Sequence, residues 1–363
     1  MNFDSIANIA DAIRAGEIVI MLDDEDRENE GDFIMAAEAV TAEKIAFIVR
    51  HSSGIICQPM TAERLAALDL PQMVANNNES HRTAFTVSVD FRHGTSTGIS
   101  AHDRALTIRA LASSDSRPAD FARPGHIFPL RYTDGGVLVR AGHTEATIDL
   151  ARIARTAAVS GILVEIVNDD GTMKRGEQLV AFAREHGLRI GTIADLIRHR
   201  LRTERTVTRV LTRSVDTEFG PFALFGYRDA FSPLPHFALV RGSLGGEDAV
   251  LTRVHVCDTL SDVLHLRGAS GVSVTTALRR IAEEGRGVLV VLSDASEAAG
   301  ALARLEAQDG TEGGAYDGRQ HGLGAQILAD LGARRLRVLG TKRRFHGLAG
   351  FGLEIAGYEE ACE

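Results

Sequence analysis

The chain has 363 residues, of which 44% are hydrophobic and 25% charged, a balance that is ordinary for a globular protein and excludes an intrinsically disordered one. The net charge of -9 argues against a nucleic-acid-binding surface. No apolar run approaches the roughly 18 residues that cross a membrane, and no positively charged leader precedes an apolar run at the N-terminus. We therefore expect a cytoplasmic protein whose partners are neither nucleic acids nor membranes.

The cysteines are few and far apart. Cys57, Cys257 and Cys362 form no C-x-x-C pair and cannot make a disulfide framework. This usage is typical of free thiols in a reducing compartment.

The first half of the chain alternates short apolar runs with longer amphipathic stretches. Thr41 and Ser100 each stand where the N-cap of a helix is expected. The alternation predicts an α/β or α+β layer fold. Strands are expected at 18–22, 33–37, 54–57 and 161–167, and helices at 41–49, 103–112 and 177–186.

A charged segment that is poor in large apolar residues, 200–206, separates the two halves, and we place the domain boundary there. A second α/β unit follows it. The sequence thus predicts two domains, 1–202 and 206–363, each a mixed sheet with packed helices. The elements expected in the second domain are strands at 237–240 and 287–292, a helix at 274–284 and a glycine-rich stretch at 310–318.

The loop from Asp23 to Asp32 carries seven carboxylates around one arginine, Arg27. Like charges packed this closely repel one another, so a compact fold holds them only if a hard cation, a basic partner or water takes up the charge. A solvated acidic loop is the plain alternative. The strand-like runs on both sides favour a site, because sites are usually built on loops at strand ends.

Polar residues gather in four further places, and each contains a turn-forming glycine or a helix start that offers backbone N–H groups to an anion. Arg140, Gly142 and Thr144 precede a helix predicted at 148–157 and are typical of an anion cradle. His143 is either a metal ligand or a histidine bonded within a turn. The four segments are 97–104, 123–126, 140–145 and 165–171.

Two residues could transfer protons. His126 follows Pro124 and Gly125 at the start of an apolar strand. Glu165 interrupts an apolar strand, where burial would raise its pKa toward the range of a general base. The alternative is an edge strand that points Glu165 at water.

Several of these motifs, in this order, resemble the 3,4-dihydroxy-2-butanone 4-phosphate synthase family over essentially all of residues 1–202. The resemblance implies the conversion of ribulose 5-phosphate into 3,4-dihydroxy-2-butanone 4-phosphate and formate, which supplies the four-carbon unit of riboflavin. It also implies a homodimer with sites near the subunit interface. The motifs are the loop 23–32, the run 97–104, the segment R-P-G-H-I-F-P-L at 123–130, the segment R-A-G-H-T-E-A-T-I-D-L at 140–150 and N-D-D-G-T-M at 168–173.

The resemblance also implies roles for individual residues. Glu28 and His143 should hold a divalent metal, normally Mg²⁺ with Mn²⁺ as a substitute, and His126 and Glu165 should be catalytic. A base that takes a carbon-bound proton and a cation that stabilises the resulting charge are what enolisation of a ketose requires. The residues implied to bind substrate are Arg27, Glu28, Asp32, Thr97, Arg140, Ala141, Gly142, His143, Thr144 and Glu165.

The second half resembles GTP cyclohydrolase II. That family binds zinc through three cysteines, and counting from Cys257 puts the other two at Gly268 and Ser270, neither of which replaces a thiolate. We therefore expect no zinc and no hydrolase activity. The segments that carry the resemblance are 227–229, 236–242, 254–255, 281–287 and 322–328.

Three other interpretations stay open. The chain is bifunctional if Cys257, His255 and His265 make an unrecognised zinc set. The second domain is otherwise a nucleotide-sensing or protein-interaction module. For the whole chain the remaining alternative is a non-catalytic calcium-binding protein, although the acidic loop lacks the spacing of such a loop.

Overall fold

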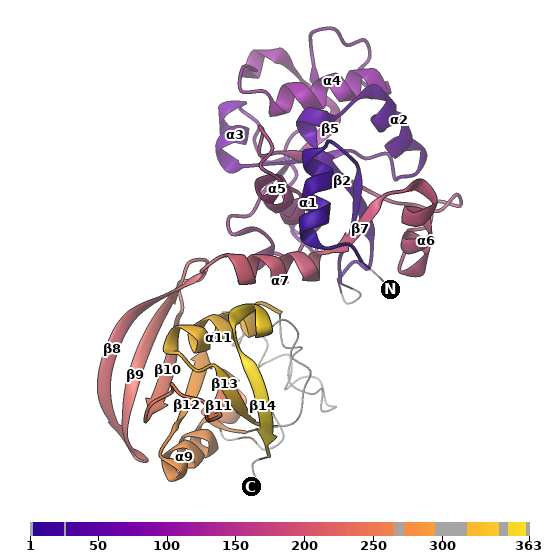
Figure 1. Cartoon of the computed structure of the whole chain (residues 1–363). Helices are drawn as coiled ribbons and strands as arrows, with labels where there is room; N and C mark the ends of the chain where they lie inside the picture. The colour runs from indigo at the N-terminus through magenta and orange to yellow at the C-terminus, as the bar shows by residue number, and fades with distance from the viewer. Residues whose placement is uncertain are drawn as a thin grey trace. The chain divides into compact units, whose positions relative to one another are not determined.

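The computed structural model describes residues 3–24, 27–264, 266, 272–294, 318–340 and 348–360. The chain divides into two compact units, Met1–Ile197 and Arg198–Glu363 (Figure 1). Helix α7 (Ile193–Thr203) spans this division, which lies a few residues before the predicted boundary segment.

The first unit is built on a seven-stranded mixed sheet with the order β4-β5-β3-β6-β2-β1-β7. The β3/β5 and β1/β7 pairs are parallel, and the other pairs are antiparallel. The strands are β1 (Val19–Leu22), β2 (Gly31–Ala36), β3 (Cys57–Met60), β4 (Val89–Phe91), β5 (Phe121–Arg131), β6 (Gly161–Glu165) and β7 (Arg189–Thr192).

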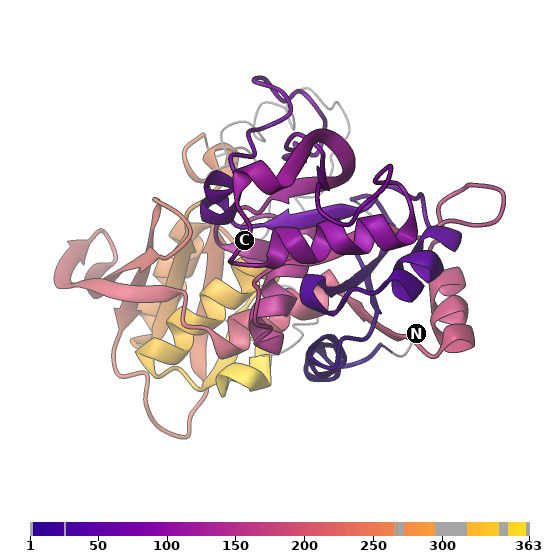
Figure 2. The same cartoon turned by 90° about the horizontal axis from the view of Figure 1, so that it is seen from above.

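Helices cover both faces of this sheet, as the view from above shows (Figure 2). Helices α1 and α5 pack together, as do α2 and α4. Every residue of β1 and β2 is buried, because helices cover both faces of the sheet, and Asp32 is the one charged residue in these two strands. The helices are α1 (Ile6–Arg14), α2 (Ala42–Arg50), α3 (Ala62–Ala67), α4 (Ala101–Ala112), α5 (His143–Ala154) and α6 (Glu177–His186), with 3₁₀ turns η1 (Ala37–Ala39), η2 (Pro118–Asp120) and η3 (Gly136–Leu138).

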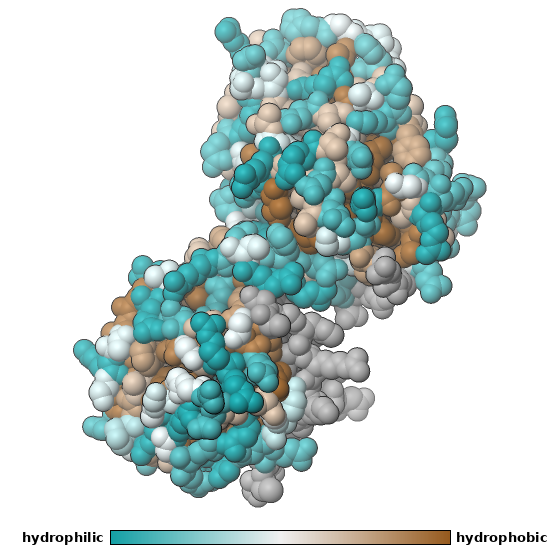
Figure 3. Space-filling view, viewed as in Figure 1, coloured by the Kyte–Doolittle hydropathy of each residue, from teal (hydrophilic) through white to brown (hydrophobic). Residues whose placement is uncertain are grey.

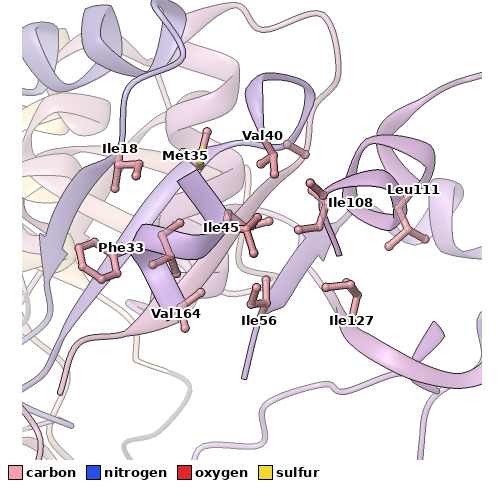
Figure 4. Close-up of a cluster of buried hydrophobic side chains, with 14 of the residues drawn as sticks. Ile18, Phe33, Met35, Val40, Ile45, Ile56, Ile108, Leu111, Ile127 and Val164 are labelled. Atoms are coloured by element: carbon pink, nitrogen blue, oxygen red, sulfur yellow. The ribbon is translucent and has the colours of Figure 1, made fainter. Parts of the chain in front are cut away.

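The main core of this unit lies between the sheet and helices α2, α4 and α6 (Figure 4). Phe33 and Met35 project from alternate positions of β2 onto this face, beside Ile45 of α2 and Ile108 of α4. All four side chains are at most 1% exposed. Polar side chains dominate the face of the molecule seen in the space-filling view (Figure 3).

The second unit contains another seven-stranded sheet, with the order β14-β13-β11-β12-β10-β9-β8. From β14 to β12 neighbouring strands are parallel, and from β12 to β8 they are antiparallel. Separate apolar clusters, one with α9 and one with α11, pack against it. The elements are β8 (Val207–Thr217), β9 (Gly220–Asp229), β10 (Pro235–Arg241), β11 (Val250–Val256), α8 (Thr259–Asp262), α9 (Val274–Glu284), β12 (Gly287–Leu292), α11 (Gly318–Leu331), β13 (Arg335–Leu339), η4 (Leu348–Phe351) and β14 (Glu354–Glu359).

The predicted fold class, two domains that each combine a mixed sheet with helices, is confirmed. The helix caps are also confirmed, since Thr41 Oγ1 accepts from Lys44 N and Ser100 Oγ from Asp103 N. The glycine-rich stretch predicted at 310–318 falls almost wholly outside the described residues. In the described part of the chain, no helix combines the length and apolarity needed to cross a bilayer.

Two element predictions were wrong. The strand predicted at 54–57 begins only at Cys57, because Gly54 takes a left-handed φ of 83° in the preceding turn. The helix predicted at 148–157 begins at His143 and ends at Ala154, where Arg155 adopts a left-handed conformation. The first turn of α5 therefore consists of residues that the sequence analysis treated as a loop.

Truncation of Phe33 tests the main core. Its ring is fully buried and lies 5.8 Å from that of Phe47 and 5.9 Å from that of Phe182, centroid to centroid. Phe33→Ala is expected to lower the free energy of unfolding of the first unit by about 3–5 kcal/mol, through lost burial and a residual cavity. The free energy of unfolding is measured in the full chain by the alkylation of the buried Cys57 at increasing urea concentrations. A loss below about 1 kcal/mol would contradict this packing.

Candidate functional site

The acidic loop connects the antiparallel strands β1 and β2, and the Asp23 side chain organises its described residues. Asp23 Oδ2 accepts from Arg27 Nη1 at 2.8 Å and from the backbone N of Glu28 at 3.2 Å. Its Oδ1 accepts from the backbone N of Glu30 at 2.9 Å. A carboxylate that accepts from several N–H groups fixes the loop backbone. This fixed backbone sets the position of Glu28.

His143 begins α5 and is 5% exposed. Its Nε2 lies 3.1 Å from the carbonyl oxygen of Met21, while its Nδ1 lies 3.9 Å from Glu28 Oε2 and 3.7 Å from Asp32 Oδ1. A carbonyl oxygen can only accept, so Nε2 carries the proton and the Nδ1 lone pair faces the carboxylates. Burial lowers the pKa of His143 and favours this neutral form.

Asp32 lies on β2 and is 2% exposed. The strand register places it opposite Met21 of β1 and Glu165 of β6. Its Oδ1 has no hydrogen-bond partner among the described residues. Burial, together with the negative charges of Glu165 and Glu28, raises the pKa of Asp32 well above its ordinary value. An ionised Asp32 at this place needs a cation.

These residues fit a divalent cation. Ligand atoms of Asp23, Glu28 and His143 all lie within 4.8 Å of one another. A neutral imidazole with carboxylate oxygens is a common ligand set for such ions. The hydrogen bond from His143 Nε2 to a backbone carbonyl is the kind of outer contact that orients a histidine ligand.

Beside this cluster, the N-terminus of α5 is suited to an anion. Gly142 is its N-cap and offers no capping side chain, so first-turn N–H groups lack an intrahelical acceptor. Two guanidinium groups flank Gly142: a Cβ built there would lie 2.5 Å from Arg140 Nη1 and 3.2 Å from Arg27 Nη2. Glycine thus lets both arginines approach the helix start, where positive charge concentrates.

Arg140 is held in place by three neighbours. Glu145 Oε2 accepts from its Nη1 at 2.7 Å, and Thr83 Oγ1 and the His81 carbonyl accept from its Nη2 at 3.0 and 3.1 Å. Glu145 is 1% exposed, so this ion pair is shielded from water. The guanidinium fork therefore has a fixed direction.

Glu165 ends β6, which lies between β3 and β2. The edge-strand alternative for this residue was therefore wrong. Its Oε2 accepts from Ser53 Oγ at 2.7 Å, and its backbone oxygen accepts from Ser53 N at 3.0 Å. Since cross-strand register sets it opposite Asp32, Glu165 belongs to the same carboxylate cluster.

His126 lies on β5 and bonds to Asp90 through its backbone N at 2.8 Å and its Nδ1 at 2.7 Å. Among the described residues no hydrogen bond or ion pair joins it to the acidic cluster. Thr97, in the loop before α4, and Ala141 are exposed, whereas Thr144 is buried in the first turn of α5.

The structure therefore brings together most of the residues that the sequence singled out, but not all of them. By the contacts above, His126 and Thr97 are not joined to this group in one chain. The residues gathered around the acidic loop and the start of α5 are Arg27, Glu28, Asp32, Arg140, Gly142, His143 and Glu165.

Sequence reasoning missed the supporting residues. Asp23 was visible only as one acid among several, and nothing in its spacing marked it as the acceptor that closes the loop. Ser53 and Asp90 carry no local signal, because each meets its partner through strand pairing or a long-range turn.

Comparison with known proteins shows the family to which the chain belongs. The family model described as 3,4-dihydroxy-2-butanone 4-phosphate synthase matches residues 7–199. The chain belongs to this family. It is 46% identical over 98% of both chains to the 3,4-dihydroxy-2-butanone 4-phosphate synthase of Pseudomonas syringae pv. tomato, and 45% identical over 98% of both to that of Neisseria meningitidis serogroup B. The chain is accordingly an enzyme of riboflavin biosynthesis.

Solved structures agree with this assignment. A two-domain 3,4-dihydroxy-2-butanone 4-phosphate synthase from A. baumannii is similar with a TM-score of 0.82 and 38% identity, covering 99% of this chain and all of that one. A synthase in complex with two magnesium ions is 51% identical, with a TM-score of 0.54, over 55% of this chain and 98% of its own.

The second unit also has a family match. The GTP cyclohydrolase II model covers residues 208–360. Whole-chain relatives include a riboflavin biosynthesis protein of Salinispora arenicola, 46% identical over 99% of this chain and 89% of its own. The predicted resemblance of this unit to GTP cyclohydrolase II is thus confirmed.

Asp32→Asn tests the buried carboxyl group. Because its pKa is raised in the fold, Asp32 stabilises the protein below its unfolded pKa of about 3.9, and that stability is lost as the pH rises through the folded pKa. Asparagine does not titrate. Without metal, the stability of Asp32→Asn relative to the unsubstituted chain should therefore rise by up to about 1.4 kcal/mol per pH unit in that window.

Urea unfolding of both chains in EDTA, at several pH values above about 4, measures this difference. Asp216→Asn, at an acid of β8 in the second unit, is the control. A difference that does not change with pH would show that Asp32 is not held protonated in the fold.

Proposed function

We propose that this chain converts D-ribulose 5-phosphate into 3,4-dihydroxy-2-butanone 4-phosphate and formate. The observation that carries the proposal is the juxtaposition of a neutral His143 facing Glu28 and Asp32 with two guanidinium groups at the start of the same helix. A cation site beside an anion site suits a phosphorylated sugar whose oxygens must also be polarised. Family membership supports the choice of substrate.

Glu28 and His143 would hold the divalent metal, Mg²⁺ or Mn²⁺ in its place, with Asp23 at the same cluster. The metal would supply stabilisation of the negative charge that develops on substrate oxygens when a carbon-bound proton is removed. Asp32 would bind substrate next to it. The name of one similar structure, a synthase in complex with two magnesium ions, supports this choice of metal.

The chain's own groups would bind the substrate and move its protons. Arg27, Arg140 and the segment Ala141–Thr144 at the start of α5 would hold the phosphate. Glu165 would take and return a carbon-bound proton, since Ser53 fixes one of its carboxylate oxygens and leaves Oε1 for the substrate. His126 of β5 would be catalytic, and Thr97 of the loop between β4 and α4 would bind substrate.

We further propose a cytoplasmic homodimer with its sites near the subunit interface. Within one chain, the described contacts do not join His126 to the acidic cluster. A second copy that supplied its own His126 would complete the site. Burial and the proposed cation role commit His143, so an imidazole from a second copy would add a proton-transferring group to the carboxylate cluster.

For the second unit we propose a GTP cyclohydrolase II-like fold without the hydrolase activity. Cys257 is the only cysteine of the expected three; Gly268 and Ser270, like His265, lie outside the described residues. His255 Nε2 is bonded to Asp262 Oδ2 at 2.7 Å, so only Nδ1 of that ring would be left for a metal ion. Similar chains from Arabidopsis thaliana include one named monofunctional and one named bifunctional, so overall similarity does not decide the activity.

Formate release tests the lyase. The purified chain with ribulose 5-phosphate should release formate with Mg²⁺ and not with EDTA. Glu28→Gln and Glu165→Gln should each lower kcat by about a hundredfold or more, because they remove a ligand and a proton-transferring group. Glu185→Gln, at an exposed acid of α6, is the matched control and should have the unsubstituted rate. If the chain released no formate with Mg²⁺ and none with Mn²⁺, the proposal would be refuted.

A GTP assay tests the second unit. The chain, incubated with Zn²⁺, should retain less than about one zinc per ten molecules after desalting and release no formate from GTP, because a single thiolate does not retain the ion. Stoichiometric zinc together with GTP hydrolysis would establish the bifunctional alternative. A rise in melting temperature with GTP but no hydrolysis would indicate a nucleotide-sensing module instead.

A further inference from the structure

The turn 77–83 is organised by the carboxylate of Glu79. Its Oε1 accepts from the backbone N of His81 at 2.9 Å and from Ser80 Oγ at 2.8 Å, and its Oε2 accepts from the backbone N of Thr83 at 3.0 Å. These hydrogen bonds, that from His81 first among them, lower the pKa of Glu79 to about 2, so the group is ionised at neutral pH. Both oxygens of one carboxylate thus hold backbone N–H groups of the turn at the same time.

Further hydrogen bonds close the same turn. Asn77 Oδ1 accepts from the backbone N of Glu79 at 3.0 Å, and Asn77 Nδ2 donates to the Thr83 carbonyl at 2.9 Å. Arg82 N donates to the Glu79 carbonyl at 3.0 Å, and Arg82 takes a left-handed φ of 53°. Residues with a side chain seldom adopt this conformation, so the path of the chain from His81 to Thr83 depends on the bonds that hold it.

Arg140, two residues before the N-cap of α5, is bonded to this turn. The His81 carbonyl accepts from Arg140 Nε at 3.3 Å and from Nη2 at 3.1 Å, and Thr83 Oγ1 accepts from Nη2 at 3.0 Å. Glu145 Oε2 accepts from Nη1 at 2.7 Å. A guanidinium group has five N–H bonds, and these contacts use four of them. The N–H that the described contacts leave belongs to Nη1, the atom that a Cβ at Gly142 would meet at 2.5 Å.

We infer that Glu79 is a positioning residue for anion binding, because it shapes the turn that directs the remaining N–H of Arg140 toward the start of α5. The turn occupies Nε and Nη2, so the guanidinium plane cannot rotate without breaking hydrogen bonds. An anion that binds there meets a group that is already ordered, and its affinity is not reduced by the cost of fixing that side chain. The inference rests on the proposed binding of the substrate phosphate by Arg140.

Among the described residues, no hydrogen bond joins this turn to the cation cluster. His81 Nδ1 lies 3.9 Å from Glu28 Oε1, which is longer than a hydrogen bond. Arg27 Nη2 lies 2.9 Å from that same oxygen and does not depend on the turn. Loss of the turn should therefore weaken the binding of the anion and leave the chemical steps almost unchanged, which raises KM and not kcat.

Glu38 offers a matched comparison. Its Oε1 accepts from the backbone N of Ala157 at 3.0 Å, and its Oε2 accepts from that of Ala158 at 2.7 Å. Like Glu79, it is an exposed residue whose two carboxylate oxygens hold two backbone N–H groups. These groups follow the C-terminal end of α5, whereas Arg140 precedes its N-terminal end. Glu38→Gln therefore makes the same chemical change at a turn that does not contact Arg140.

The test compares Glu79→Gln with Glu38→Gln in the full chain with Mg²⁺. Glu79→Gln should raise KM for ribulose 5-phosphate by about tenfold and change kcat by less than about twofold, because the amide donates where one carboxylate oxygen accepted. The inhibition constant of inorganic phosphate should rise by the same factor as KM. Glu38→Gln should match the unsubstituted chain in all three constants. An unchanged KM and phosphate inhibition constant in Glu79→Gln, or an equal change in both variants, would overturn the inference.

Thr83→Val and Thr83→Ser form a second test that leaves Glu79 in place. Valine has nearly the shape of threonine but no oxygen to accept from Arg140 Nη2, so Thr83→Val should raise KM and the phosphate inhibition constant. Thr83→Ser keeps that oxygen and should stay within about twofold of the unsubstituted chain in both constants. Equal constants for the two variants would contradict the inference.

Failure of the proposed function is seen separately. No formate from the unsubstituted chain, or a normal KM for Arg140→Gln, would refute the proposed function itself, because neither result depends on the turn. Calorimetric titration with inorganic phosphate still tests Glu79 if no formate is released. Phosphate affinity should then be weaker in Glu79→Gln than in Glu38→Gln, and equal affinities would overturn the inference.

Discussion

The buried carboxyl group of Asp32 is the constraint on which the site depends. Asp32 lies in a strand interior, faces Glu165 across the sheet and has an oxygen without a hydrogen-bond partner among the described residues. Such a group is stable only if it keeps its proton or meets a cation. The neutral His143 and the carboxylate of Glu28 complete the surroundings that a cation needs. We propose that a bound cation, rather than water alone, offsets the negative charge of the loop.

Hydrogen bonds and close backbone approaches fix this cluster in place. Asp23 closes the described loop around its own carboxylate, and the Met21 carbonyl sets the tautomer of His143. Gly142 allows Arg27 and Arg140 to approach the start of α5. Because the strands beneath are covered on both faces, their register transmits a single geometry to the loop ends. The proposed cation site and the proposed anion site are therefore fixed relative to each other.

The sequence revealed residue types but not their partners. The acidic run, the R-A-G-H-T segment and Glu165 stood out because charge and glycine interrupt apolar patterns, and the structure gathers them. The start of α5 was misplaced, because an extended glycine acts as the N-cap without a Ser, Thr, Asp or Asn signal. Asp90 and Ser53 could not be found, because their partners lie 36 and 112 positions away along the chain and meet them only in the folded sheet. Local pattern also does not show that, within one chain, no described hydrogen bond or ion pair joins His126 to the acidic cluster.

Mn²⁺ binding to the full chain, measured by electron paramagnetic resonance, tests most directly the central claim that Glu28 belongs to a defined cation site. The account predicts that Glu28→Gln weakens Mn²⁺ binding by at least about tenfold, because it removes a ligand from a defined set. Asp24→Asn, which removes the same charge from an exposed position of the same loop, should bind Mn²⁺ like the unsubstituted chain. Equal weakening by both substitutions would mean that the loop attracts cations only through its summed charge, and would contradict the account.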